Sequence, residues 1–210
     1  MKKILVNLKD WLNCEENVAF AREIDGMDVT VFPSLPYLYI YKDKNIRIGS
    51  QKISTFEEGA HTGSISASHL KDFGVEAVLL NHRECQIDDT KKICAKIKNA
   101  QEFNIEVILC IGSTDETELS KIEDVLKVTG TKGLSLAYEP VESVTFEKIK
   151  ENITFIKDKF KDYNLSYIYG NNITADNFSL YNKEIDVDGF LISSHALNVD
   201  NLRKILDLAK

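Results

Sequence analysis

The sequence is poor in the residue patterns that build disulfide, metal or nucleotide sites. It has four cysteines, and they show neither a CxxC pair nor a spacing typical of zinc ligands. No strand-to-helix turn carries a GxGxxG or a Walker lysine motif. We therefore expect no metal and no nucleotide cofactor, and we expect reduced thiols, as in a cytoplasmic protein.

Positive charge and long apolar runs are also scarce. The chain has 33 acidic residues against 26 lysines and arginines, and its net charge of -7 gives no electrostatic support for binding nucleic acid or an anionic membrane. No apolar stretch approaches the roughly 20 residues of a membrane span. The first residues, Met1 to Lys3, are not followed by the apolar core of a signal peptide. We thus expect a cytoplasmic protein with no nucleic-acid or membrane partner.

What the sequence does contain is a regular alternation of short apolar runs and amphipathic segments. Eight runs are typical of buried strands, and they lie at 3–8, 28–32, 45–49, 75–80, 106–110, 134–139, 166–169 and 187–192. Each is followed by a helix or a helix-sized segment, and the helical period is clearest from Phe146 to Phe160. Residues 52–66 have no period and predict a long loop.

Alternation of this kind implies parallel strands joined by right-handed crossovers. Eight repeats favour an α/β fold of the (β/α)8 TIM-barrel class, compact and forming a single domain over residues 1–210. An open doubly wound sheet is the structural alternative, and it is weaker because the phosphate-binding turns of such sheets are missing. In a barrel the exits of all eight strands open on one face, so the polar residues that follow the strands meet there.

Three ionisable residues follow separate strands: Lys9, His82 and Glu139. Pro140 comes directly after Glu139 and holds it in an extended conformation. An ammonium, an imidazole and a carboxylate at one mouth suit proton transfer next to a carbonyl, because the carboxylate takes the carbon-bound proton while the other two stabilise the enediolate. Singly, each residue has a structural interpretation: a surface lysine, a capping histidine and a strand-end glutamate. Their joint placement favours catalysis.

At these residues the chain resembles the triosephosphate isomerase family, nearly from end to end. The resemblance rests on Asn7-Leu8-Lys9, Ala60–Gly63, Leu80–Glu84, Cys110–Gly112, Ala137–Val141 and Asp188–Leu191. It implies interconversion of glyceraldehyde 3-phosphate and dihydroxyacetone phosphate. Glu139 would be the base and His82 the neutral electrophile, roles for which this family is itself the standard example. Lys9 would be the electrostatic stabiliser.

The resemblance also implies the residues that bind a small sugar-phosphate substrate and a partner. The substrate-binding positions would be Asn7, Glu84, Gly170, Asn171, Asn172, Ser193 and Ser194. The segment with Thr62 and Gly63 is similar to a family loop that reaches into the partner subunit, which implies a homodimer.

The sequence departs from the family where the phosphate is held. The family has a flexible, glycine-rich closing loop after the glutamate, and Glu142-Ser143-Val144 replaces it here. Asparagines and serines at 171, 172, 193 and 194 replace family residues that are mostly glycine, and Arg83 replaces a serine. Three hypotheses therefore stay open: a triosephosphate isomerase, a relative acting on another sugar phosphate or hydroxy-ketone, and a barrel with little or no isomerase activity.

Overall fold

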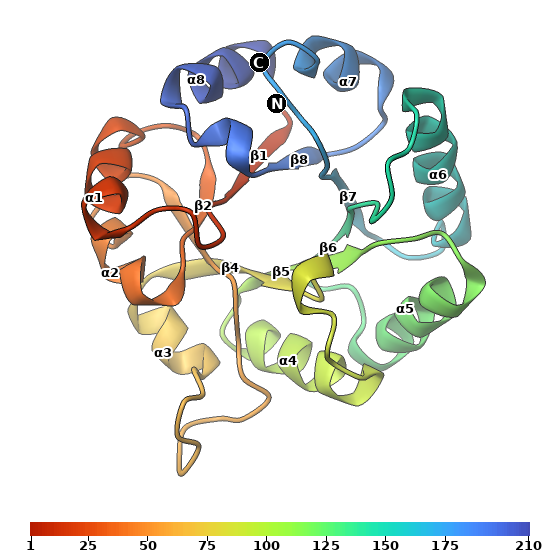
Figure 1. Cartoon of the computed structure of the whole chain (residues 1–210). Helices are drawn as coiled ribbons and strands as arrows, with labels where there is room; N and C mark the ends of the chain where they lie inside the picture. The colour runs from red at the N-terminus through yellow and green to blue at the C-terminus, as the bar shows by residue number, and fades with distance from the viewer.

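The computed structural model describes residues 1–210, and eight parallel strands close into a barrel in sequence order (Figure 1). The strands are β1 (Lys3–Asn7), β2 (Thr30–Phe32), β3 (Arg47–Ser50), β4 (Val75–Leu80), β5 (Glu106–Ile111), β6 (Leu134–Tyr138), β7 (Ser166–Tyr169) and β8 (Gly189–Ile192). β1 and β8 pair from Lys3 against Gly189 to Val6 against Ile192, which closes the ring. The predicted (β/α)8 barrel is confirmed, and the open-sheet alternative is wrong.

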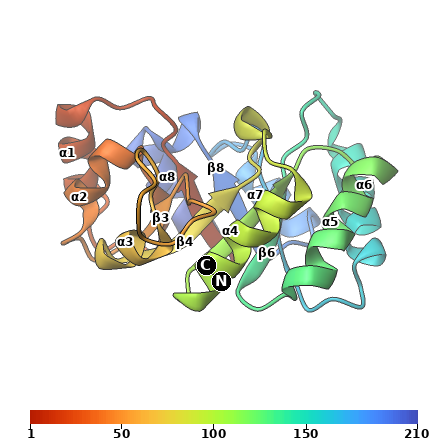
Figure 2. The same ribbon diagram turned by 90° about the horizontal axis from the view of Figure 1, so that it is seen from below.

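Helices surround this ring in both views (Figures 1 and 2). The α-helices are α1 (Cys14–Glu23), α2 (Leu38–Tyr41), α3 (Ala67–Asp72), α4 (Thr90–Glu102), α5 (Glu116–Thr129), α6 (Phe146–Lys159), α7 (Phe178–Glu184) and α8 (Val199–Leu208). Three short 3-10 helices, η1 (Leu35–Tyr37), η2 (Arg83–Cys85) and η3 (Ser194–Ala196), lie in the connections. None of the helices combines the length and the apolar composition that crossing a membrane would require.

Polar side chains set where most helices begin. Ser66, Asp89 and Thr145 each accept a hydrogen bond from a backbone N–H in the first turn of α3, α4 and α6. Thr174 does not cap α7. Thr174 and Asn177 exchange side-chain hydrogen bonds with each other's backbone N–H, which closes a separate turn, so α7 begins only at Phe178.

The apolar core has an outer and an inner part. A cluster of 48 buried residues lies between the strands and the helices. A second cluster of nine fills the inside of the barrel, and its members are Leu5, Phe32, Ala77, Leu79, Ile108, Cys110, Ala137, Ile168 and Leu191. Because alternate strand residues point inward and fill that space, the barrel is a packed core and not a pore. A ligand must therefore bind above it, at the mouth.

The connections that follow the strands stand together at one end of the barrel. In the side view, the turn that holds η2 and the connection from β1 to α1 both rise at the top (Figure 2). Residues 52–66 contain no helix or strand, as predicted, and they project away from the ring (Figure 1). The fold thus gathers the strand exits, and the polar residues on them, on one face.

Candidate active site

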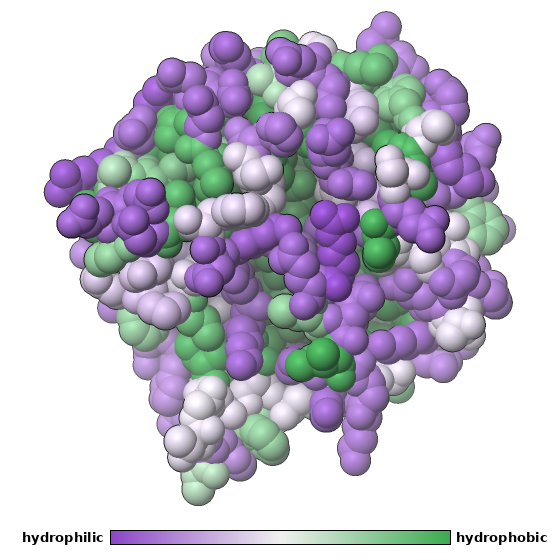
Figure 3. Space-filling view, in the orientation of Figure 1, coloured by the Kyte–Doolittle hydropathy of each residue, from purple (hydrophilic) through white to green (hydrophobic).

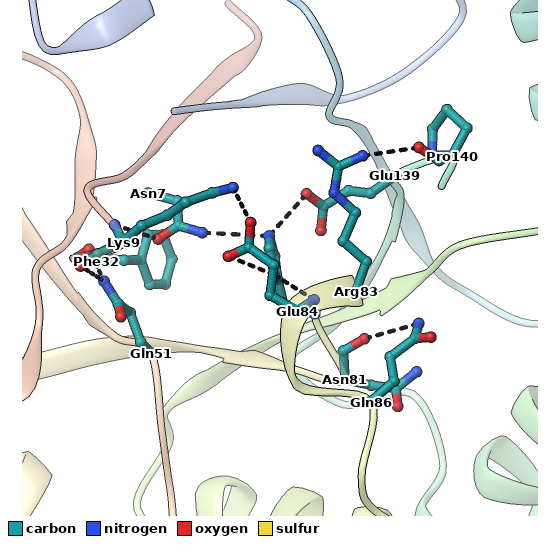
Figure 4. Close-up of polar contacts among 11 residues, drawn as sticks. Asn7, Lys9, Phe32, Gln51, Asn81, Arg83, Glu84, Gln86, Glu139 and Pro140 are labelled. Carbon is teal, nitrogen blue, oxygen red and sulfur yellow. Dashed lines mark hydrogen bonds and ion pairs between the residues drawn. The ribbon is translucent and has the colours of Figure 1, made fainter. Parts of the chain in front are cut away.

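The exit of β1 holds Lys9 in place at the mouth. Lys9 has a left-handed backbone, with a φ of 49°, and its N–H donates to Oδ1 of Asn7 at 3.0 Å. The side-chain amide of Gln51 donates to the backbone oxygens of Lys9 and Phe32, both at 2.9 Å. The Lys9 ammonium forms an ion pair with Glu84 (Figure 4). Because both ends of this residue are held, its charge has a defined position.

The exit of β4 orients His82. Asn81 has a φ of 57° and donates its side-chain N–H to the Cys110 oxygen at 3.0 Å, so the chain turns sharply just before the histidine. The N–H of Glu84 then donates to Nδ1 of His82 at 3.3 Å. A ring nitrogen that accepts a hydrogen bond carries no proton, so we assign Nδ1 as unprotonated and Nε2 as the nitrogen that carries the hydrogen. This Nε2 lies 3.2 Å from Oε2 of Glu139.

The carboxylate of Glu139 is buried at the exit of β6. The residue is only 6% exposed, and its Oε1 has no hydrogen-bond partner in the protein. A buried acceptor without a partner costs on the order of 1–3 kcal/mol, and more when it is charged. Such an oxygen is poorly solvated, so it is available to take a proton from a ligand in the cavity that Glu139 lines.

Two neighbours define the space around this carboxylate. Cys110 lies beside it inside the barrel, where burial, and next the negative charge of Glu139, raise the pKa of the thiol well above its ordinary value. Gly170 follows β7, and a Cβ placed there would meet Cγ of Glu139 at 3.1 Å. The glycine therefore leaves the room that the glutamate side chain occupies.

These side chains line one cavity of about 220 Å³ at the mouth. It brings together nine of the ten predicted catalytic and substrate-binding residues, namely Asn7, Lys9, His82, Glu139, Gly170, Asn171, Asn172, Ser193 and Ser194. Hydrophilic side chains gather over the centre of this face (Figure 3). The predicted convergence of an ammonium, an imidazole and a carboxylate is thus present in the structure.

Three further predicted residues lie outside this cavity. Glu84 is half exposed and faces an adjoining cavity of about 350 Å³ on the other side of Lys9. Its burial acts to raise the pKa of its carboxyl, but Lys9 outweighs that effect and lowers the pKa, so Glu84 is ionised at neutral pH. Thr62 and Gly63 are exposed in the projecting loop. Glu84 therefore acts on the site through Lys9 and through the ring of His82.

Beyond the predicted site residues, the cavity is lined by three polar or aromatic side chains, those of Trp11, Arg83 and His195, and by three aliphatic ones. Arg83 extends from the exit of β4 and donates from Nη1 to the Pro140 oxygen at 3.0 Å (Figure 4). The signal in the sequence is its place directly after His82, where a serine stands in the family it resembles. The contact of its side chain with Pro140 could not be predicted from its position in the sequence.

Metal binding finds no support in the geometry. No three His, Cys, Asp or Glu side chains lie close enough together to hold an ion. The chemistry of the cavity is that of a carboxylate base, a hydrogen-bond donor and fixed positive charge.

Comparison with known proteins identifies the family of this chain. The family model for triosephosphate isomerase matches residues 2–209. The chain is 32% identical over 200 residues to the triosephosphate isomerase of Blochmanniella floridana, covering 82% of this chain and 76% of that protein. It is 31% identical over 229 residues to that of Chlamydia muridarum, covering 95% and 83%, and 30% identical to that of Yarrowia lipolytica, covering 84% of each. The chain belongs to the triosephosphate isomerase family.

Proposed function

We propose that this protein is an isomerase that interconverts glyceraldehyde 3-phosphate and dihydroxyacetone phosphate through an enediolate. Its strongest support is the position of Glu139 relative to His82. The buried carboxylate of Glu139 has an unpartnered oxygen at the same cavity that receives the Nε2–H of His82. A base and a hydrogen-bond donor on one small cavity are what an enolisation needs.

The steps follow from the positions of these groups. Glu139 removes a proton from the carbon next to the substrate carbonyl. The electron pair of that C–H bond forms the carbon–carbon double bond of the enediolate, and the π pair of the carbonyl moves to its oxygen. The Nε2–H of His82 donates to the developing oxyanion, and the Lys9 ammonium stabilises its negative charge. The hydroxyl proton on the carbon that was deprotonated is then transferred to this oxyanion, and the protonated Glu139 returns its proton to the former carbonyl carbon. The carbon that lost its proton thereby becomes the new carbonyl, which completes the exchange of aldehyde and ketone.

The tautomer of His82 matters for this route. With Nδ1 accepting from the Glu84 N–H, the ring is neutral and donates only from Nε2. A neutral imidazole polarises the carbonyl without placing a full positive charge next to Glu139. Such a charge would stabilise the carboxylate and make it a weaker base. The same hydrogen bond keeps the ring plane fixed, so the donor does not have to be reoriented during the reaction.

The size of the cavity favours a three-carbon substrate over a larger sugar phosphate. Ligand pockets commonly have volumes of about 300–1,000 Å³, and the volume of this cavity is about 220 Å³. The short Glu142–Val144 connection does not cover it, so the bound intermediate is less protected from water than under a closing loop. We therefore expect slow turnover, with some loss of the intermediate by phosphate elimination.

A coupled assay on the two triose phosphates tests the proposal. We expect turnover by the wild-type protein and a loss of several orders of magnitude in Glu139→Gln, which keeps the shape of the side chain but removes the base. Equal rates for the two proteins would contradict it. A panel of longer aldose and ketose phosphates, run in parallel, distinguishes a relative with another substrate from a barrel without activity.

We further propose that the protein acts as a homodimer in the cytoplasm. Thr62 and Gly63 are exposed at the projecting loop, and Ile87, 86% exposed, borders the 350 Å³ cavity beside Lys9, so an apolar and a polar surface are both available to a partner. All four cysteines are free thiols, which fits a reducing compartment. Sedimentation equilibrium at micromolar concentration tests the dimer, and a monomeric mass would contradict it.

A further inference from the structure

The 220 Å³ cavity holds one cation that forms no ion pair with a carboxylate. Lys9 and Arg83 are the lysine and arginine that line the 220 Å³ cavity, and Lys9 is paired with Glu84. Arg83 takes part in no ion pair, and its single hydrogen bond runs from Nη1 to the Pro140 oxygen at 3.0 Å. Its other N–H donors are free, although a guanidinium can offer two parallel donors to an anion.

The position of this guanidinium is also unusual. Arg83 follows β4, yet it reaches Pro140, which follows β6. Asn171, which follows β7, has its side-chain N–H 3.4 Å from the same carbonyl oxygen. Arg83 therefore lies beside the Glu139 carboxylate, at the start of the short connection to α6 (Figure 4).

A second group at the cavity lacks a partner. The hydroxyl oxygen of Ser193, which follows β8, is buried and makes no hydrogen bond. Buried polar groups are rarely left unsatisfied, and a bound ion is one of the partners that can complete them. Arg83 gives the cavity a positive charge, and Ser193 gives it a hydroxyl donor. An anion with several acceptor oxygens could bind to both groups.

We propose that Arg83 holds the phosphate group of the substrate, in place of a loop that would close over it. The fork of the guanidinium binds phosphate oxygens, and the Pro140 carbonyl keeps the fork in position before the ligand arrives. Its charge also offsets the repulsion between the dianion and Glu139. The identity of the phosphate as part of a triose phosphate rests on the proposed function, whereas the binding of an anion by Arg83 does not.

The competing interpretation is a brace, in which Arg83 only ties the exit of β4 to the exit of β6. Two variants separate the interpretations. Arg83→Gln keeps an N–H donor for a nearby carbonyl and removes the charge, and Arg83→Lys keeps the charge and removes the fork. The matched control is Arg22→Met, which removes one positive charge from the exposed surface of α1.

Isothermal titration with inorganic phosphate is the first measurement, and it needs no catalysis. We expect Arg83→Gln to weaken phosphate binding about 10- to 100-fold, the usual effect of losing charged hydrogen bonds, and Arg83→Lys to weaken it less. Arg22→Met should bind as the wild type does. Equal phosphate affinity in Arg83→Gln and the wild type, or no phosphate binding by the wild type, would overturn the proposal, even if the protein proves to be an active isomerase.

Kinetics supply the second measurement. We expect the ratio of kcat/KM for glyceraldehyde 3-phosphate to that for unphosphorylated glyceraldehyde to fall about 10- to 100-fold in Arg83→Gln, mainly through KM. A brace would lower both specificity constants alike and leave the ratio unchanged, which would contradict a phosphate-binding role. If no variant and no wild type shows turnover, the proposed function fails, and the titration alone still decides the role of Arg83.

Discussion

Nε2 of His82 lies 3.2 Å from Oε2 of Glu139, while the N–H of Glu84 lies 3.3 Å from Nδ1 of the same ring. The two contacts fix the ring from both sides. A substrate carbonyl that enters the cavity therefore meets a donor whose direction is already set, and a base whose second oxygen is free.

Shortening the base should be enough to slow the enzyme strongly. In Glu139→Asp the carboxylate withdraws by about one methylene, and a misplacement of about 1 Å can cost roughly 10²-fold in rate. We expect kcat to fall by about that factor with the fold unchanged, as measured by the coupled assay and by circular dichroism. A kcat within threefold of the wild type would show that the position of Glu139 is not limiting.

Adding a methyl group at Gly170 should disturb the same carboxylate from the side. A Cβ there would meet Cγ of Glu139 and Cβ and O of Leu191, all at 3.1 Å. We expect Gly170→Ala to lower kcat/KM about 10- to 100-fold and to destabilise the fold by about 1–3 kcal/mol. Gly26→Ala is the matched control, because its Cβ would touch nothing within 4 Å, although its φ of +84° makes the backbone strained. It should lose stability and keep activity, so an equal loss of activity in both variants would contradict this account.

The sequence predicted the parts of this protein that depend on chain periodicity. Buried strands that end in polar residues placed Asn7, His82 and Glu139 at one face, because in a barrel that face is fixed by topology. It did not predict contacts that depend on the reach of a side chain or on an unusual backbone angle. The bond from Arg83 to Pro140 spans 57 positions, and the left-handed turn at Asn81 has no signal beyond the asparagine itself.

The thiols should differ in reactivity by their place in the barrel. Cys14 and Cys85 are exposed, whereas Cys94 and Cys110 are buried. Burial raises the pKa of both buried thiols, and Glu139 raises that of Cys110 further, so neither is a thiolate at neutral pH. We expect two cysteines to react rapidly with Ellman's reagent in the native protein and all four after unfolding in urea. Rapid native labelling of Cys110, located by mass spectrometry, would contradict the packing around Glu139.

High pH should destabilise the protein through its buried tyrosines. Burial raises the pKa of Tyr41, whose hydroxyl donates to Oδ1 of Asn17 at 2.7 Å, and burial likewise raises the pKa of Tyr169, well above the ordinary value near 10. Above about pH 10 the unfolded chain releases these protons while the folded chain keeps them. The unfolded state then binds fewer protons, so the free energy of unfolding falls as pH rises, by up to about 1.4 kcal/mol per pH unit for each such tyrosine.

Urea unfolding between pH 9 and pH 11.5 measures this slope, and Tyr41→Phe isolates one contribution to it. Phenylalanine fills the same space but has no proton to lose, so the variant should be less stable by about 1 kcal/mol at pH 8, where the hydrogen bond to Asn17 is lost. Its stability should then decline less steeply above pH 10, and the two curves should approach each other. Parallel curves across the whole range would mean that Tyr41 ionises equally well in the folded and the unfolded protein, which its burial and its hydrogen bond to Asn17 of α1 do not allow.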